Sequence, residues 1–241
     1  MTRHGKKYTD ALKKVDEERL YTVEEASSLL KEVAYANFDE SIELHARLGI
    51  DPRQADQAVR TNVVLPNGNG RVVRVLVFAA GEAERAALEA GADYAGVDEY
   101  VAQINGGWLE FDATIAMADQ MGKVGGLGRI LGRRGLMPNP RSGTVVREVA
   151  DLPGVIRELK GGRVEFRNDR TGNVHVTIGK KNFTPEQISE NLLSVVDAIS
   201  RSKPSGIKGI YCRTLTLATT MGPGIALDVN DTIAKASSVG Q

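Results

Sequence analysis

Cysteine is almost absent from this sequence: Cys212 is the only one among 241 residues. A single cysteine excludes a disulfide framework or a cysteine metal cluster within the chain. Long apolar runs are missing as well, and none approaches the roughly 18 residues that a membrane-spanning helix needs. The basic N-terminus, MTRHGKKYTDALKK, has no apolar segment behind it and does not resemble a secretory signal. These absences predict a cytoplasmic protein with no membrane segment.

The chain also lacks net charge, because 31 Lys and Arg balance 31 Asp and Glu. A neutral total argues against a generic binder of polyanions. The charges are unevenly distributed, however. Residues 16–43 hold nine acids and two bases, and residues 82–112 hold eight acids and one base. Because the bases concentrate elsewhere, we expect one surface to have a positive potential while the total cancels.

Known cofactor motifs are missing too. Gly122–Val124 places valine where a nucleotide P-loop needs Ser or Thr, and Gly126–Leu131 lacks the third glycine of the dinucleotide pattern. We therefore predict no cofactor and no metal site. His45 and His175, which lie near Glu43 and Asp169, would suit acid–base chemistry. A polar strand face explains the two histidines more simply. No catalytic residue is predicted.

What the sequence does have is a basic, glycine-rich run, GKVGGLGRILGRRGLMPNPRSGTV, at residues 122–145. Its seven glycines and two prolines predict that most of the run is neither ordinary helix nor central strand. Between Asp119 and Glu148 there is no acid and there are six bases: Lys123, Arg129, Arg133, Arg134, Arg141 and Arg147. Two interpretations stay open. The run is either a solvated loop or a segment that offers backbone N–H groups and cations to an anion.

Both ends of the chain show strands with one polar face. In SIELHARL, apolar and polar residues alternate, which is typical of a half-buried strand. Residues 163–167 and 173–178 flank a turn sequence and predict a β-hairpin. Capping boxes at Thr22 and Thr184 predict two helix starts, and residues 210–220 form a threonine-rich strand.

The middle of the chain differs. Residues 72–80 are a nearly continuous apolar strand, residues 82–90 an acidic helix, and residues 113–116 a second short apolar strand. Such alternation predicts a small parallel sheet with helices on both faces. We therefore predict an α+β and α/β protein of two domains. Domain I comprises 1–68 plus 160–241 with an antiparallel sheet, and domain II is a Rossmann-like α/β domain, 69–159, inserted in it.

The outward positions of the predicted strands share hydrogen-bonding chemistry. They are Glu43, His45, Arg47, Arg167, Asp169, Arg170, Thr214 and Thr216. Cations suit phosphates, whereas carboxylates and hydroxyls suit 2′-hydroxyls and base edges, so the mixture favours structured RNA. At the end of the long strand, the glycines of TTMGPG (219–224) would let a ligand approach the backbone; a plain strand-end turn is the alternative.

Several segments together resemble the L-one family of large-subunit ribosomal proteins, in its bacterial branch. The most recognisable is GKVGGLGRILGRRGLMPNP. The other matching segments are FDESIELHARLGIDP, LPNGNG, AGADYAG, GRVEFRNDRTGNVHV and TTMGP. They follow one another in order along essentially the whole chain, so the combination is highly specific.

The resemblance implies a two-domain protein, monomeric within the ribosome, that binds the stalk region of large-subunit rRNA. It also implies a role in the movement and release of deacylated tRNA from the exit site, and repression of translation of its own operon mRNA. The implied RNA-binding residues are Phe38, Ser41, Glu43, His45, Arg167, Asp169, Arg170, His175, Thr214, Thr220, Met221 and Gly222. Lys123, Arg129, Arg133, Arg134 and Arg141 are candidates for a tRNA or secondary RNA contact. A non-ribosomal RNA-binding translational regulator and a Rossmann-like enzyme are the alternatives.

Overall fold

The structure, a computed structural model, describes residues 5–239 apart from the side chains of Ala55, Arg141 and Val239. The chain divides into two compact units: unit 1 is Met1–Gly70 with Arg163–Gln241, and unit 2 is Arg71–Gly162. The predicted divisions fall after residues 68 and 159. Antiparallel strands make up unit 1 and parallel strands make up unit 2. The predicted mixed fold class is confirmed.

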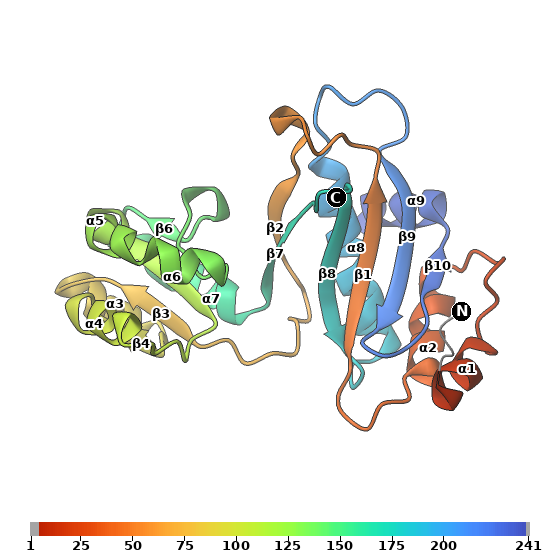
Figure 1. Cartoon of the computed structure of the whole chain (residues 1–241), viewed down its shortest axis with the longest axis horizontal. Coiled ribbons are helices and arrows are strands. Elements are labelled where there is room, and N and C mark those ends of the chain that lie inside the picture. Colours follow the sequence, from red (N-terminus) through yellow and green to blue (C-terminus); the bar gives the residue numbers. More distant parts are fainter. Residues whose placement is uncertain (1–4, 240–241) are drawn as a thin grey trace. The chain divides into compact units, whose positions relative to one another are not determined.

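Unit 1 is an antiparallel sheet with helices packed on it. Its elements are α1 (Lys6–Leu12), α2 (Val23–Val33), β1 (Ser41–Leu48), the 3-10 turn η1 (Ala55–Gln57), β2 (Arg60–Val64), β7 (Arg163–Arg167), β8 (Asn173–Lys180), α8 (Pro185–Arg201), β9 (Cys212–Thr219), β10 (Ile225–Leu227) and α9 (Val229–Val239). Four strands pair in the order β10-β9-β1-β8, while β2 and β7 form a separate ladder (Figure 1). The central strand β1 therefore pairs with two strands that come from the far end of the chain.

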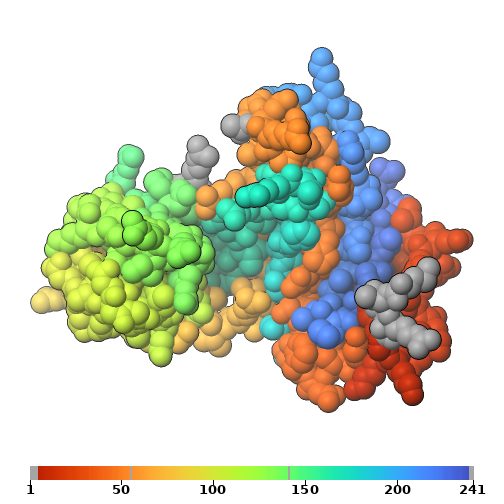
Figure 2. Space-filling model, in the orientation of Figure 1, coloured from red at the N-terminus to blue at the C-terminus, as the bar shows by residue number. Residues whose placement is uncertain are grey.

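One face of the four-stranded sheet is buried under α2, α8 and α9. Leu30 of α2 and Leu192 of α8 lie in the same buried cluster as Leu44 of β1 and Leu217 of β9. Each such side chain contributes roughly 1.5–3 kcal/mol when it is fully buried. The opposite face holds the exposed and half-exposed side chains of the strands. Figure 2 shows β1, β8 and β9 at the molecular surface, in orange, teal and blue.

The two predicted helix starts in unit 1 are confirmed. The Thr22 hydroxyl accepts the backbone N–H of Glu25, and the Glu25 carboxylate accepts the N–H of Thr22. Thr184 and Gln187 make the same reciprocal pair at the start of α8. Each pair satisfies two N–H groups that have no partner within the helix.

Unit 2 is a parallel sheet in the order β4-β3-β5-β6. Its elements are β3 (Val75–Phe78), α3 (Glu82–Glu89), β4 (Tyr94–Ala95), α4 (Asp98–Asn105), β5 (Ala113–Met117), η2 (Ala118–Gln120), α5 (Met121–Val124), η3 (Gly125–Leu127), α6 (Gly128–Arg133), η4 (Pro140–Ser142), β6 (Val145–Val146), η5 (Val149–Asp151) and α7 (Leu152–Lys160). Val77 of β3 packs in one cluster with Ala87 and Ile156, and Phe78 packs in another with Ile104. Helices thus cover both faces of the sheet, as in doubly wound folds.

The prediction that most of the glycine-rich run is not helical is wrong for its first half. Consecutive helical elements η2, α5, η3 and α6 run from Ala118 to Arg133. Three apolar side chains at helical spacing, Val124, Leu127 and Leu131, are buried in the cluster that contains Phe78. Their burial outweighs the roughly 1 kcal/mol that each glycine costs in a helix. The second half is rich in turns, and Gly135 and Gly143 there have positive φ.

Candidate nucleic-acid interface

Strand β1 sorts its side chains between the two faces of the unit 1 sheet. Leu44, Ala46 and Leu48 are buried against the helices, whereas Glu43, His45 and Arg47 are on the other side. Successive strand residues point to opposite faces, so this separation follows directly from the alternating sequence. We call the solvent side of the four-stranded sheet the open face. It is formed by Glu43, His45, Arg47, Asn173, His175, Thr177, Thr214, Thr216 and Ala218.

Strand register groups the predicted site residues into rows across the open face. His45 lies opposite His175 of β8 and Thr216 of β9. In the next row, Arg47 lies opposite Asn173 and Thr214. The structure therefore brings together Glu43, His45, His175 and Thr214 of the predicted set.

Two further polar residues of β8, Asn173 and Thr177, share this face and were not among the predicted site residues. The alternation in NVHVTI, where Val174, Val176 and Ile178 are buried, is the signal that identifies them. Their amide and hydroxyl groups extend the polar rows onto the edge strand β8.

The centre of the open face is a pair of histidines. The Nδ1 atoms of His45 and His175 are 2.8 Å apart, so one ring donates a hydrogen bond to the other. Partial burial is the main cause of a lowered pKa of His45, and the neighbouring His175 lowers it further. Glu43 raises the pKa, but by less. His45 Nε2 lies 3.9 Å from Glu43 Oε2, and His175 Nε2 lies 3.8 Å from Asp169 Oδ2. These separations exceed hydrogen-bond length, so neither ring is oriented by a carboxylate as a general base would be.

Asp169 shapes the turn between β7 and β8. Its Oδ1 accepts the N–H groups of Thr171 and Asn173, both at 2.8 Å, and the Thr171 hydroxyl donates to the same carboxylate. These bonds hold the pKa of the Asp169 carboxyl well below its usual range. Arg167 and Arg170 are exposed on either side of it. The carboxylate thus fixes a turn that presents two arginines beside His175.

At the end of the sheet where β1 starts, Thr220 is bound to Ser41. The Thr220 hydroxyl accepts the Ser41 N–H at 2.9 Å and lies 3.3 Å from the Ser41 carbonyl oxygen. Lys180 Nζ donates to the Ser41 hydroxyl at 3.0 Å. Thr220 is itself exposed, and Ser41 is buried. The pair closes the ladder between β1 and β9 and leaves Thr220 at the rim of the open face.

The two glycines after β9, Gly222 and Gly224, are favoured by close packing within the protein. A Cβ on Gly222 would overlap Thr219 Oγ1, which accepts the Gly222 N–H at 3.1 Å. A Cβ on Gly224 would come within 2.9 Å of Thr216 Cγ2. The turn therefore packs too tightly against β9 for a side chain at either position.

Two apolar side chains are exposed at this same end of the sheet. Phe38, just before β1, is 53% exposed, and Met221, just after β9, is 50% exposed. Because β1 and β9 are neighbours with Ile42 opposite Thr219, both segments leave the sheet at the same end. An exposed aromatic ring and a thioether beside a polar face are suited to contact with unstacked bases.

The basic segment of unit 2 is a second surface. Arg129, Arg133 and Arg134 are exposed on α6 and the residue after it. Lys123, by contrast, forms an ion pair with Asp98, with Nζ 2.7 Å from Oδ1. The Arg141 side chain lies outside the described part of the structure. A Cβ at any of the helical glycines 122, 125, 126, 128 and 132 would meet nothing within 4 Å, so packing within the protein does not require glycine there.

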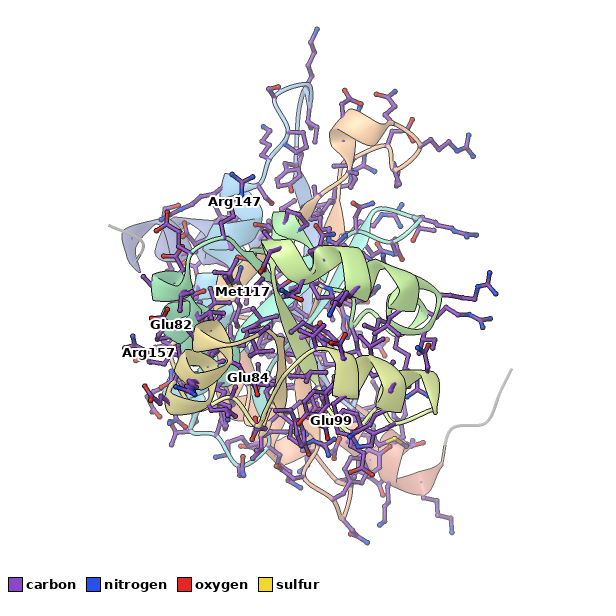
Figure 3. The ribbon with its side chains drawn as sticks, turned by 90° about the vertical axis from the view of Figure 1, so that its left-hand side faces the viewer. Glu82, Glu84, Glu99, Met117, Arg147 and Arg157 are labelled. Carbon is purple, nitrogen blue, oxygen red and sulfur yellow. The ribbon has the colours of Figure 1, made fainter. Side chains whose placement is uncertain are left out.

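The carboxyl-terminal edge of the parallel sheet in unit 2 holds carboxylates together with two bases, Lys123 in α5 and Arg147 directly after β6. This edge is where doubly wound domains bind nucleotides. Glu82 and Glu84 occupy the first turn of α3, and Glu99 the first turn of α4, at the same edge as Met117 at the end of β5 (Figure 3). Carboxylates at these helix starts would repel a pyrophosphate.

Other kinds of site find no support in the part of the chain that the structure describes. No group of three or more His, Cys, Asp or Glu side chains is arranged to hold a metal ion among residues 5–239. Burial raises the pKa of the Cys212 thiol to about 11, so it is unreactive. None of the described helices is both long and apolar enough to cross a membrane.

Comparison with known proteins gives consistent matches. The model of the ribosomal protein L1p/L10e family matches residues 30–223. The chain is 66% identical over 236 residues to the large ribosomal subunit protein uL1 of Thermomicrobium roseum, covering 98% of both chains. It is 59% identical to the uL1 protein of Chloroflexus aurantiacus, covering 95% of this chain and 96% of the relative. For the uL1 protein of Thermus thermophilus the identity is 50%, with 95% and 99% covered.

Proposed function

The chain belongs to the ribosomal protein L1p/L10e family and is a structural protein of the large ribosomal subunit, and we propose that it binds the stalk region of the large-subunit rRNA through the open face of unit 1. The family consists of ribosomal structural proteins and not of enzymes. The proposed RNA-binding surface extends from Phe38 and Met221 at one end of the open face to Arg167 and Arg170 at the other.

The observation that supports this surface most strongly is the mixed chemistry of its rows. Arginines and the ring N–H groups of histidines are suited to phosphate oxygens. Glu43 and the threonines of β9 are suited to 2′-hydroxyl groups and base edges, which distinguish RNA from DNA and one fold of RNA from another. A surface for unspecific phosphate binding would need cations alone.

A second use of the same face is repression of translation. A messenger segment that folds like the rRNA stalk would present the same phosphates and 2′-hydroxyls to the same rows. The protein would then bind its own operon mRNA only when free rRNA stalks are scarce. Competition between the two RNAs for one face is the physical basis of this proposal.

Contact with exit-site tRNA is proposed for the basic segment of unit 2. Its exposed arginines 129, 133 and 134 lie on α6 and the residue after it, and the run α5, η3 and α6 contains five glycines at which a Cβ would meet nothing within 4 Å. A phosphate backbone can approach such a surface closely, because no Cβ stands in the way. The movement and release of deacylated tRNA would depend on this contact, whereas binding of the rRNA stalk would not.

Crosslinking with position mapping tests the proposal. The protein is crosslinked in intact large subunits, and the linked amino acids and nucleotides are both identified. Crosslinks from stalk rRNA to the open face are the expected result. Crosslinks to stalk rRNA that fall only on unit 2 would contradict it. Failure to sediment with large subunits through a moderate-salt cushion would favour a regulator that acts away from the ribosome.

Salt dependence provides a second test of how the open face binds. Released counterions weaken binding as salt rises. Because carboxylates and hydroxyls share the face with its cations, we expect a log–log slope shallower than about −6, the value for seven phosphate contacts on duplex at roughly 0.9 each. A steeper slope would mean that phosphate contacts alone hold the RNA.

A further inference from the structure

Glu40 is a charged residue with no exposed surface. It lies between α2 and β1, directly before Ser41. Its Oε1 accepts the N–H of Ala36 at 2.7 Å, and its Oε2 accepts the N–H of Met221 at 3.0 Å. A carboxylate is rarely buried without partners that offset its lost hydration. The partners here belong to two segments that are 185 residues apart in sequence (221 − 36).

One further bond joins these two segments, and two more tie residues 34–40 to Lys181, which follows β8. The Tyr35 hydroxyl donates to the Met221 carbonyl oxygen at 2.7 Å. The Lys181 N–H donates to the Glu40 carbonyl oxygen at 2.9 Å, and Lys181 Nζ donates to the Ala34 carbonyl oxygen at 2.9 Å. Both backbone groups of Met221 are thus held by side chains of residues 35 and 40, while its own side chain is half exposed.

Phe38 lies in a short segment that is held at both ends. It lies between Ala36, whose N–H is bound by the Glu40 carboxylate, and Glu40, whose carbonyl oxygen is bound by Lys181. The chain is therefore fixed on both sides of the exposed ring. One buried carboxylate is thus bonded to the backbone of Met221 itself and of Ala36, two residues before Phe38, at the rim of the open face.

We propose that Glu40 is a positioning residue for RNA binding, which fixes Phe38 and Met221 in the arrangement that the RNA contacts. The inference rests on the proposed function of the open face. A side chain held in its bound position before binding loses less conformational entropy when the ligand arrives. Glu40 touches no RNA itself, because it has no exposed surface.

The test is the variant Glu40→Gln in the full chain. Glutamine has the same shape, but its amide group would place an NH₂ donor against the N–H of either Ala36 or Met221. We expect binding to a transcript of the rRNA stalk to weaken about tenfold, the scale of one lost buried hydrogen bond. The salt slope should stay at its wild-type value, because no cation is lost. An altered slope would overturn the proposed mechanism.

The matched control is Asn191→Asp, which makes the opposite exchange at another buried site. Asn191 of α8 has no exposed surface, accepts the N–H of Asn67 at 3.0 Å, and donates to the carbonyl oxygens of Gly68 and Ile178. This variant should lose stability but keep its affinity for the transcript. If Glu40→Gln weakens binding no more than Asn191→Asp does, then Glu40 has only a structural role and the proposal is wrong.

A double-variant cycle tests the coupling directly. In the Met221→Ala background, Glu40→Gln should weaken binding clearly less than it does alone, because part of what it positions is gone. Full additivity would overturn the proposal. If Glu40→Gln does not fold, Tyr35→Phe takes its place, with an expected loss of a few-fold that is again smaller in the Met221→Ala background. A wild-type protein that does not bind the transcript would reject the proposed function itself.

Discussion

Thr220→Val is the most specific test of the hydrogen bonding at the end of the sheet where β1 starts. It removes one hydroxyl and keeps the side-chain shape. In the wild-type protein this hydroxyl accepts the N–H of Ser41 at 2.9 Å, and Ser41 is only 8% exposed. A buried donor left without a partner costs about 1–3 kcal/mol. We expect the unfolding free energy of unit 1 to fall by that amount, which lowers Tm by about 2–4 °C per kcal/mol in a domain of this size.

The same variant should also bind the rRNA stalk transcript more than tenfold more weakly, because Thr220 is exposed at the rim of the open face. Thr220→Ser is the matched control, since it keeps the hydroxyl and loses only a methyl group. Urea denaturation and a filter-binding titration of both variants measure the two effects separately. If Thr220→Val unfolds at the wild-type urea concentration, the bond to Ser41 contributes nothing and our account of this rim is wrong.

Three further predictions address other parts of the molecule. Arg133→Ala combined with Arg134→Ala should leave binding to the isolated stalk transcript nearly unchanged in a gel shift, since exposed charges contribute little individually; a large loss would put the RNA on unit 2. Stability should fall as pH drops below about 6.5, because the pKa of His45 is lowered in the folded protein and the unfolded chain binds the proton more readily. His45→Gln should flatten this dependence in urea denaturation between pH 7.5 and 5.5, and an unchanged slope would contradict the assignment. Residues 1–70 joined to 163–241 by a short flexible linker should fold cooperatively and bind the transcript, as monitored by circular dichroism and gel shift; a disordered product would count against the division into units.

Local chemistry explains which features of unit 1 are predictable from sequence. A strand has a period of two, so the alternation around His45 is enough by itself to identify the open face. The capping boxes at Thr22 and Thr184 are equally predictable from sequence, because both partners of each bond lie within four residues. These features depend on near neighbours in the chain.

Features that depend on distant partners are not predictable in this way. The bond between His45 and His175 joins strands 130 residues apart. Glu40 resembles an ordinary surface acid in sequence, and only the fold shows that it is buried between two segments. The helix through the glycine-rich run escapes prediction because tertiary burial of Leu127 and Leu131 overrides the low helix propensity of the residues around them.

The order of the strands also has a consequence for how this chain folds during its own synthesis. Strand β1 ends at Leu48, but its neighbour β9 begins at Cys212. At about 5–20 residues per second, roughly 10–30 seconds of translation separate the two strands. Unit 2 is continuous in sequence, so it can complete its parallel sheet while β1 still has two unpaired edges. The nascent chain must keep those edges from pairing with other chains until β8 and β9 have left the exit tunnel.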